Sequence, residues 1–183
     1  MTVFYGSENQ PKSIFGEDTP ELEAFYDALW EVLPGGMTCL HTIQACWDAK
    51  AYKYQWTLPD GHVCIDRVMV PKDVKIEVDE LDHATFTHRI YVNSPKQRGR
   101  SLAANVIHSI DAYIVREMYR MAAAQGFPLL TIHDCFYSSP NFMNEVRQNY
   151  ITIMTRLSKQ NLLQDILRQL TNTQDVFIKK SQD

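Results

Sequence analysis

The sequence has no long apolar run and little Gly or Pro, and each absence excludes a class of protein. No run approaches the roughly 20 apolar residues that a membrane-spanning helix needs. The first ten residues lack a basic region, so no signal peptide is predicted. With seven Gly, eight Pro and 45% hydrophobic residues among 183, the chain is neither collagen-like nor mainly disordered. We therefore expect a globular chain of one domain, or one and a half, with no membrane partner.

Cysteine and positive charge are also limited. The four cysteines, Cys39, Cys46, Cys64 and Cys135, form no CxxC pair and match no zinc spacing. Buried free thiols in a reducing compartment are the simplest interpretation, which predicts a cytoplasmic protein. The net charge is −4, whereas a free-standing nucleic-acid-binding protein usually has a basic surplus. The charge balance therefore argues mildly against such a protein.

The pattern of apolar residues predicts an α+β fold. Helical spacing predicts helices over residues 20–33, 38–50, 101–125, 140–157 and 162–170. Alternation of apolar and polar residues predicts a hairpin at 52–68, and two more strands are predicted at 74–78 and 85–92. A short apolar strand at 129–132 and a returning strand at 135–137 predict a second, shorter hairpin.

Turn-forming residues mark the boundaries of these elements. Thr19 and Pro20 favour the start of a helix, and the run Pro34-Gly35-Gly36 is expected to stop it. Pro59-Asp60-Gly61 predicts the turn of the first hairpin, since Pro fixes φ and Gly accepts a positive φ. Residues 1–18 are rich in turn formers and are expected to contain the end of one element followed by a loop.

The strongest signal for chemistry is the run Leu129–Phe136, which reads LLTIHDCF. It places His133 and Asp134 at the end of a strand that is predicted to be buried, beside a tight turn. A buried carboxylate needs a cation, a metal or several donors, and a carboxylate beside a phosphate ligand is a common magnesium site. From this run alone, an Asp that caps the turn beside a His at the edge of the core is the simpler alternative.

A second polar patch lies on the helix predicted at 101–125. Asn105, His108 and Asp111 recur every third residue, so they share one face of the helix. A hydrogen-bonded core network explains the patch equally well, but two polar patches in apolar elements favour a joint site. Tyr5-Gly6, at the end of a short apolar segment, is by itself more typical of a helix stop.

Taken in order, four segments resemble motifs of the single-subunit RNA polymerases of bacteriophages and mitochondria. Tyr5-Gly6-Ser7 is similar to the end of the fingers helix of that family, and Trp56–Gly61 is similar to its W-x-T/S-P-D-G hairpin with one residue inserted or shifted. Ala104–Asp111 resembles its P-N-F-V/I-H-S-x-D helix, and Ile132–Phe136 resembles its catalytic HD-S/C-F/Y motif. The resemblance implies part of a right-hand polymerase, with a small antiparallel sheet and a catalytic β-hairpin packed on helices.

The same resemblance implies a division of the chain and roles for individual residues. Residues 1–50 would form the C-terminal part of the fingers and residues 51–183 the palm. Asp134 would be one of two carboxylates that bind the catalytic Mg2+ ions, and His133 would support the turn near the transcript end. Tyr5 would lie beside the incoming rNTP and take part in choosing ribose over deoxyribose. The residues implied to line the nucleotide and hybrid side of the cleft are Tyr5, Gly6, Ser7, Asn105, His108 and Asp111.

The chain also departs from the family pattern. The other catalytic Asp of the family and the Lys of its fingers helix lie far upstream of the Tyr-Gly pair, whereas this chain begins four residues before Tyr5. An N-terminal polymerase polypeptide is therefore expected to carry both, and this chain is expected to be the C-terminal segment of a split enzyme. That enzyme would bind a DNA template and an RNA transcript, in the host cytoplasm if a phage encodes it.

Two alternatives stay open. One is a metal-dependent phosphohydrolase that uses His133 and Asp134 with other histidines, although such enzymes usually place a His-Asp pair on a helix. The other is an accessory or remnant polymerase module that binds a partner without performing chemistry.

Overall fold

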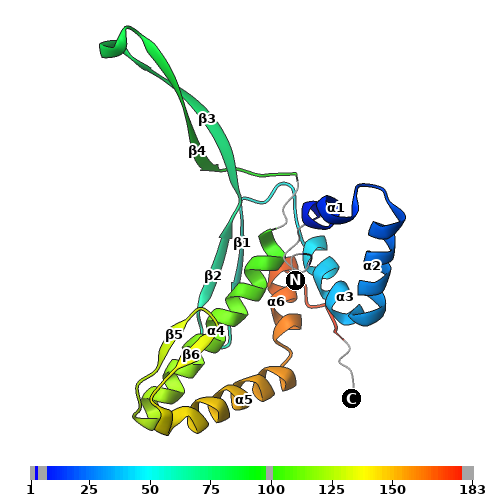
Figure 1. The fold of residues 1–183 in the computed structure, drawn as a ribbon, viewed down its shortest axis with the longest axis vertical. Helices are drawn as coiled ribbons and strands as arrows, with labels where there is room; N and C mark the ends of the chain where they lie inside the picture. Colours follow the sequence, from blue (N-terminus) through cyan, green and yellow to red (C-terminus); the bar gives the residue numbers. More distant parts are fainter. Residues whose placement is uncertain (1–2, 4–7, 98–100, 179–183) are drawn as a thin grey trace. The chain divides into compact units, whose positions relative to one another are not determined.

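The structure of the chain is a computed structural model that describes residues 3, 8–97 and 101–178 (Figure 1). The helices in these residues are α1 (Asn9–Phe15), α2 (Pro20–Val32), α3 (Pro34–Ala45), α4 (Ser101–Gln125), α5 (Met143–Lys159) and α6 (Leu162–Thr171). The strands are β1 (Lys53–Thr57), β2 (Val63–Arg67), β3 (Met69–Val78), β4 (Ala84–Asn93), β5 (Leu130–Ile132) and β6 (Cys135–Tyr137). Short 3-10 helices at Asp79–Leu81 and Pro140–Phe142 complete the described elements. None of the helices in the described ranges is long and apolar enough to cross a membrane.

The α+β class predicted from the sequence is confirmed. The described strands form three separate two-stranded sheets, β1-β2, β3-β4 and β5-β6. Each sheet pairs strands that are consecutive in the chain, and the pairing in β3-β4 and β5-β6 is antiparallel. The prediction of small antiparallel sheets is therefore confirmed for these two sheets.

The chain divides into two compact units. Unit 1 consists of Met1–Tyr54 and Ile65–Leu102, and unit 2 consists of Gln55–Cys64 and Ala103–Asp183. Unit 1 contains α1, α2, α3 and the β3–β4 hairpin, and unit 2 contains the β5–β6 hairpin, α5, α6 and most of α4.

Local signals explain the start of α2 but not that of α3. Thr19 caps α2, because its Oγ1 accepts a hydrogen bond from the Leu22 amide at 3.3 Å, and Pro20 occupies the first turn as predicted. The predicted stop at Pro34 is correct for α2, but the same Pro opens α3, which the sequence had predicted to begin at Thr38. A first-turn Pro has no N–H to leave unsatisfied, so it can begin a helix as readily as it ends one. Helix α1 was not predicted, because its seven residues have no side-chain cap.

Unit 2 is built on the long helix α4, whose bounds agree with the prediction. Its inner face packs Ile114, Met118 and Ala122 into a cluster with Phe127, Val146 and Ile153. Helix α4 is not buried on all sides, because Ile107, His108, Asp111 and Tyr119 are exposed.

The four cysteines are free thiols, but they are not all buried. Cys39, Cys46 and Cys64 are half-buried, and burial raises the pKa of each of these thiols. Cys135 is exposed, which corrects the prediction for this residue. Its partner across the β5–β6 hairpin, Ile132, is exposed as well. Cys135 is exposed because it lies on the outer face of this hairpin, which no described residue buries.

Candidate active site

The β5–β6 hairpin places His133 and Asp134 in a two-residue turn. Ile132 pairs with Cys135, so only these two residues connect the strands. His133 has a φ of 53°, in the left-handed region, and two-residue hairpin turns favour such a conformation because it matches the twist of the strands. The sequence-based prediction of an acid at a bend between two paired strands is therefore confirmed.

The carboxylate of Asp134 is exposed, which corrects the expectation of a buried strand end. The strand β5 buries only one of its faces, since Leu130 is 60% exposed and Ile132 is 54% exposed. Burial therefore does not force Asp134 to have a cation. Exposure instead leaves its oxygen atoms accessible to a ligand, and Cys135 Sγ lies 3.8 Å from one of them.

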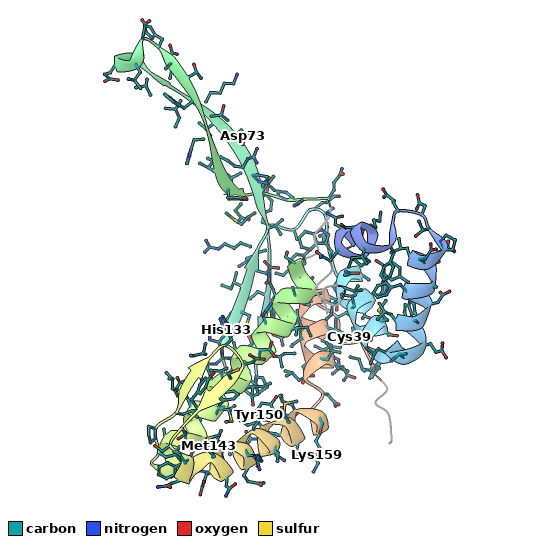
Figure 2. The ribbon with its side chains drawn as sticks, in the orientation of Figure 1. Cys39, Asp73, His133, Met143, Tyr150 and Lys159 are labelled. Atoms are coloured by element: carbon teal, nitrogen blue, oxygen red, sulfur yellow. The ribbon has the colours of Figure 1, made fainter. Side chains whose placement is uncertain are left out.

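The inner face of the same hairpin fixes the turn in unit 2. Phe136 packs against the buried cluster of α4 and α5, and its ring centroid lies 6.0 Å from that of Tyr150. Thr131 Oγ1 lies 3.3 Å from the Tyr119 hydroxyl, which ties β5 to α4. At the base of the hairpin, Ser138 Oγ donates a hydrogen bond to the Pro128 carbonyl at 2.6 Å. Figure 2 shows the result, with His133 at the free end of the hairpin and Tyr150 on α5.

The predicted polar face of α4 lies in the same unit. His108 and Asp111 are exposed and Asn105 is half-buried, so these three residues present the shared face that their spacing indicated. Tyr5, Gly6 and Ser7 lie outside the described residues. The structure thus brings His133 and Asp134 together and groups the α4 residues, and it does not place the Tyr-Gly segment relative to either.

The segment Trp56–Gly61 is anchored to α4 by two polar contacts. The Trp56 ring is buried, and its Nε1 donates to Ser109 Oγ at 2.9 Å. Asp60 has only 3% of its side chain exposed, and its Oδ2 accepts from Arg116 Nε at 2.5 Å. The hydrogen bond from Arg116 is the main cause of an Asp60 pKa below its usual value.

Sequence reasoning missed the role of Arg116, although one signal was available. Between Ser101 and Met118 the sequence contains a single Arg and no Lys. An isolated guanidinium in a mostly apolar helix needs a hydrogen-bond acceptor. This need could have prompted a search for a carboxylate elsewhere in the chain. Asp60 lies 56 positions away in the chain, so local patterns did not connect the two.

The metal-ligand requirement is only partly met by the described residues. Asp134 supplies a hard oxygen ligand of the kind that Mg2+ prefers. Among the residues that the structure describes, however, Asp134 belongs to no group of three potential ligands. The group found there, Glu77, Asp79 and His83, is exposed at the tip of the β3–β4 hairpin, and His83 Nδ1 lies 3.0 Å from Glu77 and 3.3 Å from Asp79. A magnesium site at Asp134 therefore needs a further carboxylate.

Comparison with known protein families identifies a match. A family model described as DNA-dependent RNA polymerase matches residues 37–182. The match spans most of the chain and includes Trp56–Gly61, Ala104–Asp111 and Ile132–Phe136. A search of curated proteins found no match.

Proposed function

Because the chain belongs to the DNA-dependent RNA polymerase family of the single-subunit, phage and mitochondrial type, we propose that it is the C-terminal catalytic segment, or small subunit, of a split polymerase. In this proposal residues 1–50 complete the fingers and residues 51–183 form the palm. The assembled enzyme transfers rNTPs onto the 3′ end of RNA on a DNA template, and this chain is inactive without the upstream polypeptide.

The observation that carries the proposal is the exposed Asp134 in a turn that is anchored from behind. Phe136 and Thr131 hold the hairpin against α4 and α5, so the Asp134 carboxylate is presented at a defined position. When bound, a pair of Mg2+ ions would stabilise the attacking 3′-hydroxyl and the leaving oxygen. The role of this chain would be to hold one ligand oxygen, that of Asp134, in a fixed position, so that little reorganisation of the protein is needed when the metal ions bind.

The outer face of the β5–β6 hairpin supports the need for another polypeptide. The apolar residues on this face, Leu130, Ile132, Cys135 and Tyr137, are all exposed. Two strands of three residues are too few for a stable sheet in water. A strand that carries the second catalytic carboxylate would cover this face or extend the sheet, and an upstream polypeptide would bring it.

The remaining site residues are assigned by the same proposal. The Tyr5 hydroxyl would read the 2′-OH of the incoming rNTP, since this group alone separates ribose from deoxyribose. Gly6 would let the chain pass close to the template. Ser7, Asn105, His108 and Asp111 would face the nucleotide and the hybrid. The position of His133 and Asp134 in a strand turn, rather than on a helix, favours this reaction over phosphohydrolysis.

The test is transcription by the pair of chains, reconstituted with Asp134→Asn. Loss of one charged group at a reacting centre commonly lowers the rate by about 10²-fold or more, so we expect at least that loss. Asp175→Asn is the matched control, because Asp175 is an exposed Asp of the same unit beyond the end of α6. Near-normal elongation by the Asp134 variant would remove this residue from the metal site. Metal-dependent NTP hydrolysis by the isolated chain would support the phosphohydrolase instead.

A further inference from the structure

A carboxylate buried between α4 and α5 holds two exposed arginines. Only 6% of the Glu117 side chain is exposed. Its Oε1 accepts a hydrogen bond from Arg120 Nη1, one turn further along α4, and its Oε2 accepts one from Arg156 Nη1 of α5 at 3.0 Å. Both guanidinium groups stay open to solvent, because 61% of the Arg120 side chain and 43% of the Arg156 side chain is exposed. We call Arg120 and Arg156 the arginine pair.

The arginine pair has more charge and more hydrogen-bond donors than Glu117 uses. Two guanidinium groups beside one carboxylate leave one positive charge without a counter-charge. Each guanidinium carries five N–H donors, and among the described residues the side chains of the pair are hydrogen-bonded only to Glu117. A tie between α4 and α5 needs Arg156 alone, since Arg120 lies on the same helix as Glu117. The planar N–H fork of Arg matches the oxygen atoms of a phosphate group, so a phosphate is the ligand that the spare donors suit.

Glu117 also orders the two side chains before any ligand binds. An arginine that is already hydrogen-bonded loses less conformational entropy on binding than a free one. The two helices that carry the pair share one buried cluster, to which α4 contributes Met118 and α5 contributes Ile153. The positions of the two guanidinium groups relative to each other are therefore set by the fold of unit 2.

The acidic surplus of the chain lies elsewhere. Residues 8–45, which include α1, α2 and α3, contain seven carboxylates and one Lys. Residues 117–125 of α4 and the whole of α5 together contain four Lys and Arg residues and two carboxylates. Lys159 is exposed one turn after Arg156, at the end of α5 (Figure 2), so it extends the positive surface. The net charge of the chain therefore does not argue against phosphate binding at this place.

The arginine pair lies away from the turn that carries Asp134. Successive residues of an α-helix are about 100° apart around the axis, so Glu117 and Tyr119 lie about 200° apart on α4. Tyr119 contacts β5, so the β5–β6 hairpin and the arginine pair lie on opposite flanks of α4. A phosphate bound by the pair is therefore not the one that reacts at Asp134. A strand with a phosphate at every nucleotide can extend from one place to the other, whereas a single nucleotide cannot.

We propose that Arg120 and Arg156 bind a phosphodiester group of a nucleic-acid strand, with Lys159 beside the next phosphate. Contacts of this kind position a strand and carry no sequence information. Non-specific binding through phosphates has a Kd of about 10⁻⁴ to 10⁻⁶ M at physiological salt, and we expect a value in this range. The contact needs neither Asp134 nor an upstream polypeptide, so it goes beyond the proposed function and stands or falls separately from it.

The test is binding of a labelled oligouridine of about 20 nucleotides to the purified chain, measured by fluorescence anisotropy over a range of salt concentrations. Each phosphate contact to a single strand contributes about 0.7 to the slope of log K against log salt. Arg120→Gln and Arg156→Gln should therefore each reduce the slope by about 0.7, which corresponds to a Kd about fivefold higher at 0.1 M salt. Arg147→Gln is the matched control. It removes the same charge from α5 nine residues before Arg156, about 180° away around the helix, and it should leave the slope unchanged.

Each Arg variant of the pair leaves Glu117 one arginine, so neither leaves a buried charge unpaired, and circular dichroism checks the fold. A parent chain that does not bind the oligouridine overturns the proposal. Equal changes in slope for the Arg120 and Arg147 variants also overturn it, because they would show a general attraction by charge.

Two competing ligands separate the phosphodiester from other acceptors. Oligothymidine DNA of the same length should respond to the variants as the RNA does, because both strands share the phosphate, and a response of RNA alone would assign the contact to the 2′-hydroxyl and overturn the proposal. Inorganic phosphate at constant ionic strength should not displace the strand. Displacement by phosphate from the parent chain, but not from the Arg120 variant, would assign the pair to a free oxyanion and overturn the proposal.

Discussion

The two hairpins β3–β4 and β5–β6 differ in length and in what holds them. The strands of β3–β4 are ten residues long and pair throughout, yet the paired apolar side chains of Ile76 and Phe86 are exposed. The strands of β5–β6 are three residues long, yet Phe136 joins the buried cluster and Thr131 contacts Tyr119. The number of paired residues therefore does not decide how firmly a turn is positioned. Packing against a core does, and the turn that carries Asp134 has this support.

The largest expected effect comes from removing that support. Phe136→Ala deletes a half-buried ring that packs on the cluster of α4 and α5. We expect a loss of about 2–3 kcal/mol in the free energy of unfolding, below the 3–5 kcal/mol typical of a fully buried Phe. Tyr91→Ala on the long hairpin is the control, because Tyr91 is 64% exposed, and it should cost less than about 1 kcal/mol. Urea unfolding followed by circular dichroism measures both, and equal losses would contradict the comparison.

A second contrast lies in two Arg–Asp pairs, one in each unit. Asp60 is buried against Arg116, whereas Asp73 and Arg89 pair on the exposed surface of β3–β4. Asp60→Asn should lower the free energy of unfolding by about 2 kcal/mol, less than the loss of one partner of a fully buried pair, because Arg116 is partly exposed. Asp73→Asn should give no measurable change, as is usual for exposed pairs. If both variants unfold at the same urea concentration as the parent chain, Asp60 does not anchor the turn.

The dependence on pH provides a check on the Asp60 pair. Hydrogen bonding to Arg116 lowers the pKa of Asp60 in the folded chain. A lowered pKa means that the contribution to stability is fully present above the ordinary Asp pKa of about 4 and is lost as the pH falls through the folded value. The difference in unfolding free energy between the parent and Asp60→Asn should therefore be constant near neutral pH and shrink below about pH 4. A difference that grows on acidification would contradict the assignment.

Local signals in the sequence predicted much of the fold. The cap at Thr19, the turn at Pro59-Asp60-Gly61 and the long apolar pattern of α4 each depend on residues close together in the chain. They predicted these elements because capping and turn formation are short-range effects. Pro34 was misinterpreted for the same reason, since its local effect fits the end of one helix and the start of the next.

The site was less predictable, because it depends on packing over long distances in the chain. The sequence predicted the turn at His133 and Asp134, but not that one face of the strand before it is exposed. The contact between Asp60 and Arg116 joins residues 56 positions apart, and no local pattern contains it. A short apolar strand looks the same in sequence whether one face or both are covered.

The smallest expected effect concerns a matched pair of histidines at the two hairpin tips. His133 has a φ of 53° and His83 a φ of 58°, a conformation that costs a non-Gly residue about 1 kcal/mol. His133→Gly and His83→Gly should each relieve that cost. Both should raise the free energy of unfolding by no more than about 0.5 kcal/mol, because Gly also gains entropy in the unfolded chain. The two variants should differ in transcription by the reconstituted polymerase, where only His133→Gly loosens the turn that presents Asp134. Equal rates for the two variants, at equal stability, would show that the conformation at His133 has no part in positioning the carboxylate.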